Sequence, residues 1–263
     1  MSFTPILQAL ALVGGVGLFV GIFLGIAYKR FYVKADEREE AVLAALPGAN
    51  CGGCGYSGCA ALAAAIAKGE APVNSCPVGQ KPVADEIAKI MGTTAAEEEK
   101  KVAFVRCTGN CEKTSGKYVY TGTENCRVAT FAPGRGPKSC AFGCAGLGDC
   151  VKACEFGALS IQEGIAQVDP EKCMDCRKCM KVCPKHLITE IPYSAVSRIG
   201  CSNPGKGKPV MDNCKVGCIS CTMCARNCPA EAIEMVDGLP VIDYGKCTGC
   251  GLCKEKCPRG CLV

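Results

Sequence analysis

The chain opens with a long apolar segment and then changes abruptly to short segments of mixed polarity. From Ile6 to Tyr28 nearly every side chain is apolar, and Gln8 is the one strongly polar exception. These 23 residues are enough to cross a bilayer as a helix. Because no basic residue precedes the run and it is too long for a signal-peptide core, the pattern predicts a transmembrane anchor over residues 1–30.

Basic residues follow the apolar run directly, namely Lys29, Arg30 and Lys34. Basic residues are retained on the cytoplasmic side of a membrane. We therefore expect a single-pass protein of the prokaryotic cell (inner) membrane with its bulk on the cytoplasmic side. Glycine recurs at residues 17, 21 and 25, which favours close packing against partner helices, although glycine is also common in membrane helices generally.

Residues 34–91 combine short helical patterns with a cysteine motif. We expect a charged helix over 34–45, a small amphipathic helix over AALAAAIAKGE and a closing helix over 83–91. The motif has the spacing CxxCx4Cx16C and consists of Cys51, Cys54, Cys59 and Cys76. Four thiolates suffice for one [4Fe–4S] cluster, with zinc as the alternative. The region is thus predicted to be a small, mostly helical cluster domain, followed by a charged linker over 92–101.

The C-terminal part of the chain repeats one cysteine spacing twice. CISCTMCARNCP and CTGCGLCKEKCP both have gaps of two, two and three residues and end on a proline. This is the spacing of bacterial two-cluster ferredoxins, in which the fourth cysteine of each run ligates the other cluster. One predicted ligand set is Cys218, Cys221, Cys224 and Cys257. The other is Cys247, Cys250, Cys253 and Cys228, and two zinc knuckles are the alternative.

The same arrangement occurs 74 residues earlier, which indicates a duplicated ferredoxin module. Residues 154–173 and 228–247 each contain two strand signals around a turn. The first run of the earlier copy departs from the pattern, because CAFGCAGLGDCVKACE has gaps of three, five and three and Glu155 replaces the proline. The regular set of this copy is Cys173, Cys176, Cys179 and Cys154. The other predicted set is Cys140, Cys144, Cys150 and Cys183.

Further cysteines lie outside these sets. Two pairs precede the ferredoxin runs of the two copies, and together they suggest a sixth cluster that bridges the modules, held by Cys107, Cys126, Cys201 and Cys214. Buried free thiols, or a set that uses Cys111, are the alternatives. Cys111 and Cys261 receive no role, and His186 is expected on the surface or in packing.

Composition supports metal ligation. The chain has 26 cysteines, and their regular spacings argue against an oxidised disulfide scaffold. The formal charge is +5 with every cysteine neutral. A [4Fe–4S] core with four thiolates carries about −2, so five or six clusters make the loaded protein roughly −5 to −7. We therefore do not expect nucleic acid as a partner.

The anchor, the CGGCGYSGC motif and the ferredoxin runs together resemble the B subunit of the Rnf complex in its long form, which carries a duplicated ferredoxin module. The resemblance covers essentially the whole chain. It implies an iron–sulfur electron-relay subunit of a membrane-bound, ion-translocating ferredoxin:NAD+ oxidoreductase, a translocase. It also implies reduced ferredoxin or flavodoxin, and the flavin- and NAD-binding and membrane subunits of the complex, as partners. No catalytic residue is expected in this chain beyond the cluster ligands.

Together these patterns predict an α+β chain with a transmembrane helix, a small helical [4Fe–4S] domain and two tandem two-cluster ferredoxin-like modules. The expected boundaries are 1–30, 34–91, 92–101, 102–200 and 201–263. Five [4Fe–4S] clusters follow from the runs, with a sixth from the bridging set. Two other functions are open: a membrane-tethered polyferredoxin that serves another redox enzyme, or a cluster-based redox sensor.

Overall fold

The computed structural model describes residues 3–31, 36–95 and 99–263. Its first element is α1 (Thr4–Phe31). No proline interrupts residues 6–31, so the helical hydrogen bonds continue, and the basic residues at 29 and 30 lie at the negative end of the helix dipole. Within the described residues one stretch is long and apolar enough to cross a membrane, Leu12–Phe31, and none of it is buried. This agrees with the predicted anchor.

Three short helices form the helical domain, which we define as residues 36–92. They are α2 (Glu37–Ala45), α3 (Cys59–Ala67) and α4 (Gln80–Met91). Asp36 caps α2 through its side chain, and Gly92, with φ of 67°, ends α4 in the left-handed conformation that favours glycine. The largest fully buried side chains of its core are Val42, Leu62, Ile66 and Ile87. Of the predicted linker over 92–101, residues 96–98 lie outside the described residues.

The two ends of the first module, residues 101–192, pair with each other as strands. Strand β1 (Lys101–Val105) pairs antiparallel with β4 (Ile188–Pro192), in register from Lys101↔Pro192 to Val105↔Ile188. Between them lie α6 (Asp149–Lys152), the hairpin of β2 (Leu159–Gln162) and β3 (Ile165–Val168), and α7 (Lys178–Val182). Glu163 and Gly164, both at positive φ, form the two-residue turn that the sequence predicts.

The second module, residues 198–263, repeats this plan at an offset of 74 residues. Its elements are α9 (Met223–Arg226), β5 (Ile233–Val236), β6 (Leu239–Ile242) and α10 (Leu252–Glu255). Its ends meet at the bridge Ile199↔Leu262. Because Arg198 and Val263 also exchange backbone hydrogen bonds of 2.8 and 2.9 Å, this module starts a few residues before the predicted boundary at 201. Helix α8 (Lys208–Asn213) precedes its first cysteine run.

The first module also carries an insert, residues 108–139. It contains α5 (Cys126–Ala129) and a 3-10 turn, η1 (Pro133–Arg135). The bridge Gly116↔Lys138 closes residues 116–138 into a loop. The insert is thus a closed loop that returns the chain to the first cysteine run of the module.

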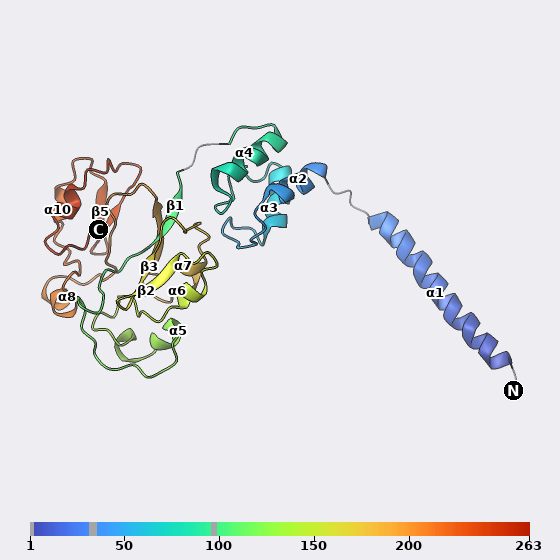
Figure 1. The fold of residues 1–263 in the computed structure, drawn as a ribbon, viewed down its shortest axis with the longest axis horizontal. Helices are drawn as coiled ribbons and strands as arrows, with labels where there is room; N and C mark the ends of the chain where they lie inside the picture. Colours follow the sequence, from blue (N-terminus) through green and yellow to red (C-terminus); the bar gives the residue numbers. More distant parts are fainter. Residues whose placement is uncertain (1–2, 32–35, 96–98) are drawn as a thin grey trace.

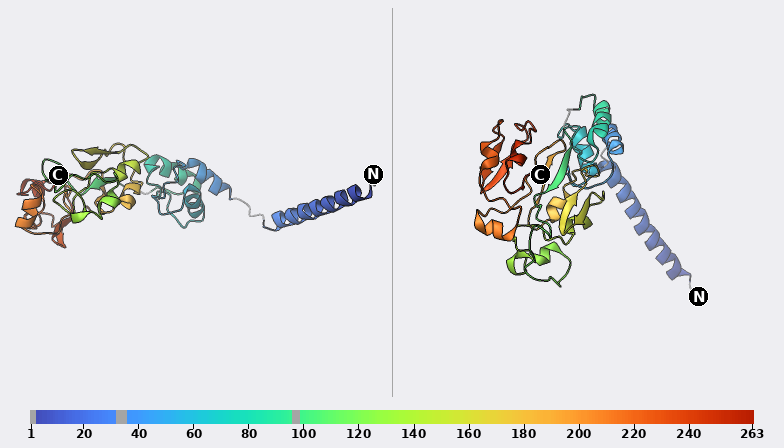
Figure 2. Two further views of the ribbon diagram at one scale, coloured as in Figure 1. Left: turned by 90° about the horizontal axis from the view of Figure 1, so that it is seen from below. Right: turned by 60° about the vertical axis from the view of Figure 1, so that its left-hand side comes forward.

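The three cysteine-bearing units lie in a row, with the helical domain, then the first module, then the second module (Figures 1 and 2). Gln80 of the helical domain donates to the Met174 sulfur of the first module at 3.3 Å. The two modules join through backbone hydrogen bonds, Thr108 N–H to the Gly200 carbonyl at 3.0 Å and Lys215 N–H to the Lys113 carbonyl at 2.8 Å.

Candidate metal centres

Each cysteine run turns around a cavity by placing left-handed residues between its cysteines. Ser220 and Thr222, with φ of 59° and 62°, flank Cys221, and Gly249 and Gly251 occupy the same positions of the next run. Such residues turn successive backbone N–H groups toward the inside of the loop, which creates a concavity suited to an anion. For serine and threonine this conformation is unfavourable. The backbone of each loop is therefore held in a conformation that suits a bound anion.

The second module contains two cavities, each lined by four cysteines that the spacing groups. The Cys218 site consists of Cys218, Cys221, Cys224 and Cys257. The Cys247 site consists of Cys228, Cys247, Cys250 and Cys253. The fourth cysteine of each run lies in the site of the other run, as the ferredoxin pattern predicts. Backbone donors face the sulfurs, since Ala232 N–H lies 3.4 Å from Cys228 Sγ.

One cavity of the first module also matches its predicted group. The Cys173 site consists of Cys154, Cys173, Cys176 and Cys179. Ala103 N–H, on β1, donates to Cys173 Sγ at 3.3 Å, and Ala158 N–H donates to Cys154 Sγ at 3.4 Å. Lys178 forms a close ion pair with Glu155, the residue in the position of the missing proline. The departure at Glu155 therefore leaves the site intact.

The second cavity of the first module differs from the predicted group by one residue. The Cys144 site consists of Cys126, Cys144, Cys150 and Cys183, so Cys126 stands where Cys140 was predicted. Cys126 is the first residue of α5, and its N–H donates to Asp149 Oδ2 at 2.9 Å. Burial raises the pKa of the Cys126 thiol, and the backbone N–H groups of Asp149 and Leu147 beside it oppose that shift.

Cys140 instead joins the bridging group, where Cys126 was predicted. The bridging site consists of Cys107, Cys140, Cys201 and Cys214, two cysteines from each module. Cys144 N–H donates to Cys107 Sγ at 3.3 Å, and in the second module Cys218 N–H donates to Cys201 Sγ at the same 3.3 Å. The two halves of the site are thus related by the repeat.

The offset of 74 residues contains the signal for this exchange. It pairs Cys140 with Cys214, and both begin the short motif C-x2-G-C. It also pairs Leu147 with Cys221, so the first copy lacks one cysteine inside its loop. Cys126 of the insert lies against Leu147 and takes this place from outside the run. The sequence prediction differs from these cavities because it paired cysteines by their order before each run, and not by the repeat register.

The helical domain packs three of its four cysteines, Cys54, Cys59 and Cys76, into its core beside the loop that leads into α3. Together with Cys51, the half-buried first cysteine of that loop, they form the predicted set that we call the Cys51 site. Asn50 Oδ1 accepts from Cys59 N–H at 2.8 Å, which holds the start of α3 against the loop. Gly79 N–H lies 3.4 Å from Cys76 Sγ.

The cavities and the donors around their sulfurs suit iron–sulfur clusters. Among the described residues, no three cysteine, histidine or carboxylate side chains converge closely enough to hold one metal ion. The sulfurs instead surround cavities and receive backbone N–H groups, which stabilise the negative charge of an iron–sulfur core. Burial, reinforced by neighbouring cysteines, raises the pKa of Cys150 and of Cys179 to about 12. A metal that binds there as thiolate complex must therefore displace protons.

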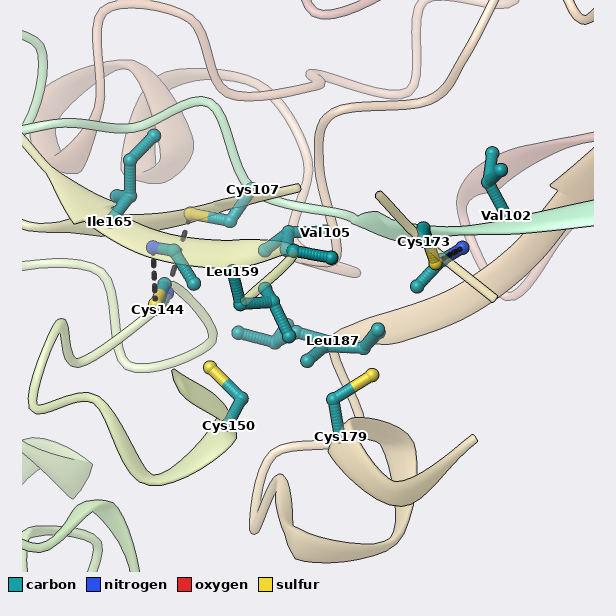
Figure 3. Packing of buried hydrophobic residues seen from close by; sticks show 14 of the residues in the cluster. Val102, Val105, Cys107, Cys144, Cys150, Leu159, Ile165, Cys173, Cys179 and Leu187 are labelled. Atoms are coloured by element: carbon teal, nitrogen blue, oxygen red, sulfur yellow. Dashed lines mark hydrogen bonds between the residues drawn. The ribbon is translucent and has the colours of Figure 1, made fainter. Parts of the chain in front are cut away.

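Cysteine side chains alternate with aliphatic ones in the core of the first module. Figure 3 shows Cys150 and Cys179 below Leu159 and Leu187. The half-buried Lys185 donates to the Gly143 carbonyl at 2.8 Å. Burial lowers its pKa, while the neighbouring cysteines of the bridging and Cys144 sites oppose that shift. The ammonium group lies where it can offset negative charge at both sites.

Two cysteines lie outside these groups. Cys111 is exposed, and its N–H donates to the Glu163 carbonyl at 2.9 Å. Cys261 is buried, with 2% exposure, and lines the cavity of the Cys218 site as a fifth cysteine. His186 is exposed in a turn after Cys183, which agrees with its expected surface position.

Comparison with known families identifies iron–sulfur domains in all three units. Residues 46–78 match the family described as "Putative Fe-S cluster". Residues 139–187 and 217–262 match two families that are each described as a 4Fe-4S dicluster domain. Iron–sulfur chemistry and two tandem ferredoxin-like modules are thereby confirmed.

Relatives cover nearly the whole chain. The B subunit of the Na+-translocating ferredoxin:NAD+ oxidoreductase complex of Acetobacterium woodii is 44% identical over 98% of this chain and 77% of the relative. The B subunit of the ion-translocating oxidoreductase complex of Methanosarcina acetivorans is 43% identical over 97% of this chain and 96% of the relative. The chain belongs to the family of Rnf B subunits. A third relative, the B subunit of the proton-translocating ferredoxin:NAD+ oxidoreductase complex of Clostridium ljungdahlii, is 37% identical over 94% of this chain and 88% of the relative.

Membership in the family of Rnf B subunits confirms the resemblance stated from the sequence. Together with the apolar helix α1, it indicates that the protein is associated with a membrane. The iron–sulfur domains make this Rnf B subunit an electron carrier.

Proposed function

We propose that this chain is the electron-relay subunit of an ion-translocating ferredoxin:NAD+ oxidoreductase. It accepts electrons from reduced ferredoxin or flavodoxin and delivers them to the other Rnf subunits. The observation that supports the proposal is that the five four-cysteine cavities and the cysteines of the helical domain follow one another, each joined to the next by a short backbone segment or by helices. When bound, [4Fe–4S] clusters supply the one-electron chemistry, and the side chains of this subunit ligate and space them.

The first step of the series joins the helical domain to the first module. Gly53 lies within the loop of the Cys51 site, and a Cβ on it would lie 3.1 Å from the Cys176 carbonyl oxygen. Cys176 belongs to the Cys173 site. The absence of a side chain at Gly53 therefore lets these two sites approach each other.

The next steps run through the first module. Helix α7 carries Cys179 of the Cys173 site and ends just before Cys183 of the Cys144 site. Beyond it, the hydrogen bond from Cys144 N–H to Cys107 Sγ links the Cys144 site to the bridging site. Each pair of neighbouring sites is thus joined by its own short backbone segment.

The bridging site leads into the second module in the same way. Cys218 N–H donates to Cys201 Sγ, and Cys218 belongs to the next site. Helices α9 and α10, which contact each other, carry Cys224 of the Cys218 site and Cys253 of the Cys247 site. The proposed order begins with the Cys51 site, the Cys173 site and the Cys144 site. It continues through the bridging site to the Cys218 site and ends at the Cys247 site.

The proposed location places all six sites on the cytoplasmic side. Helix α1 anchors the chain, and Lys29 and Arg30 at its end favour that orientation. Glycines 17, 21 and 25 have open space where a side chain would stand, so a helix of another Rnf subunit can approach this face. Flavin, NAD and the translocated ion are assigned to those other subunits.

The test is a Cys140→Ala variant in the purified membrane complex. We expect the loss of about four irons with their acid-labile sulfide, and of ferredoxin-driven NADH formation, since the bridging site is the middle of the series. Cys111→Ala is the matched control and should change neither quantity. Unchanged NADH formation after the loss of iron would overturn the series. A chain that purifies without the other Rnf subunits would favour the polyferredoxin alternative.

A further inference from the structure

One buried thiol remains unused beside the Cys218 site. Cys261 has 2% exposure, lines the same cavity and lies with its sulfur 3.5 Å from Cys257 Sγ. Cys218 lines the same cavity. Cys261 therefore contacts one of the four sulfurs of the site directly and shares the cavity with the other three.

The repeat shows what this position holds when no thiol is present. At the offset of 74 residues the counterpart of Cys261 is Leu187, which is equally buried, with 3% exposure. Leu187 N–H donates to Cys183 Sγ at 3.4 Å, and Cys261 Sγ lies 3.5 Å from Cys257 Sγ, where Cys257 is the counterpart of Cys183. Both residues thus contact the last cysteine of their module's second run, whereas the thiol is present in the second module alone.

The geometry points to Cys261 as a positioning residue that donates an S–H hydrogen bond to Cys257 Sγ, a sulfur ligand of the Cys218 site. This inference rests on the proposed cluster at that site. Since Cys218, Cys221, Cys224 and Cys257 already supply four ligands, Cys261 keeps its proton and can donate it. A donor stabilises sulfurs more strongly when they carry more negative charge, which is the reduced state. The thiol therefore makes the Cys218 site easier to reduce than it would be with a leucine at residue 261.

The test is a redox titration, followed by electron paramagnetic resonance, of the anaerobic full-length chain carrying Cys261→Leu. The variant reproduces the first module, so the fold should tolerate it. We expect full iron content and a fall of about two- to tenfold in the equilibrium constant for reduction of one cluster, where tenfold equals 59 mV for one electron. Cys261→Ser keeps a donor and should shift less.

The reciprocal variant, Leu187→Cys, should shift one cluster in the opposite direction. If Cys261→Leu loses about four irons, Cys261 is a ligand and the inference is wrong. If iron content and every potential stay the same, the hydrogen bond has no effect and the inference is equally wrong. Failure of the proposed function is seen separately, as a wild-type chain that lacks the iron and sulfide for six clusters. Should Cys261→Leu not fold, Cys261→Ala provides the same comparison.

Discussion

A single leucine explains the irregular cysteine run of the first module. Leu147 lies between Gly146 and Gly148, which have φ of 79° and 83°, as Cys221 lies between two left-handed residues in the second module. The loop thus has the same turned backbone as its counterpart, with a leucine at its centre in place of the cysteine. Cys126 supplies the sulfur from α5 of the insert.

Introducing a cysteine at residue 147 should make Cys126 of the insert dispensable. We expect Cys126→Ala to lose about four irons, because three ligands remain at the Cys144 site. Adding Leu147→Cys to that variant should recover them, since the loop geometry for a cysteine at this position is still present. Iron and acid-labile sulfide analysis of the two purified variants measures both effects. No recovery in the double variant would show that the two loops are not equivalent.

Lys185 offers a second prediction for a single residue. Its ammonium group is half-buried beside the bridging and Cys144 sites, so it stabilises additional negative charge there. Lys185→Met should lower the reduction potential of at least one cluster with no loss of iron. A redox titration measures the change. Lys181→Met, an exposed neighbour on α7, is the control and should leave all potentials unchanged.

Among the elements, the contact between the helical domain and the first module depends on a glycine. A side chain at Gly53 meets the backbone of Cys176 at 3.1 and 3.2 Å. Gly53→Val should therefore separate the Cys51 and Cys173 sites and slow ferredoxin-driven NADH formation several-fold at full iron content. Ser57→Val changes an exposed residue of the same loop and should have no such effect. An unchanged rate for Gly53→Val would mean that electrons do not pass through this contact.

The elements were predictable where a local pattern specifies them. The apolar helix, the two hairpins with their turns at Glu163 and Asp237, and the regular cysteine runs follow from residues close together in the sequence. The partner of Cys126 could not be found in this way, because the insert folds back over many residues to reach Leu147. Spacing rules describe one loop, whereas this site combines two. The repeat register was the remaining guide, and it groups Cys140 with Cys214 as the structure does.

At the scale of the whole molecule, the cysteines of the proposed metal sites also form much of the buried core of each module. The buried cluster of the second module includes Cys201, Cys218, Cys224, Cys253 and Cys261 among few aliphatic residues. The core of the first module is built similarly. Such small cores bury little apolar surface, so cluster binding must contribute a large part of the folding free energy.

Removal of iron should consequently unfold both modules. We expect an anaerobic chelator to abolish the hydrogen-exchange protection of the β2–β3 and β5–β6 hairpins. Helix α1 in a detergent micelle should remain helical under the same treatment and serves as the internal control, because it contains no ligand. Hairpins that stay protected after complete removal of iron would show that the aliphatic side chains suffice.

The bridging site has a mechanical consequence for the two modules. Its ligands Cys107 and Cys201 lie about 100 residues apart, so a loaded site acts as a covalent cross-link over a long loop. By the chain-entropy relation used for disulfides, a cross-link of that span stabilises the folded state by about 4 to 5 kcal/mol. While the site is loaded, pulling on the two ends of the pair should rupture them as one cooperative unit. Once it is emptied, the same pull should open them as two separate domains.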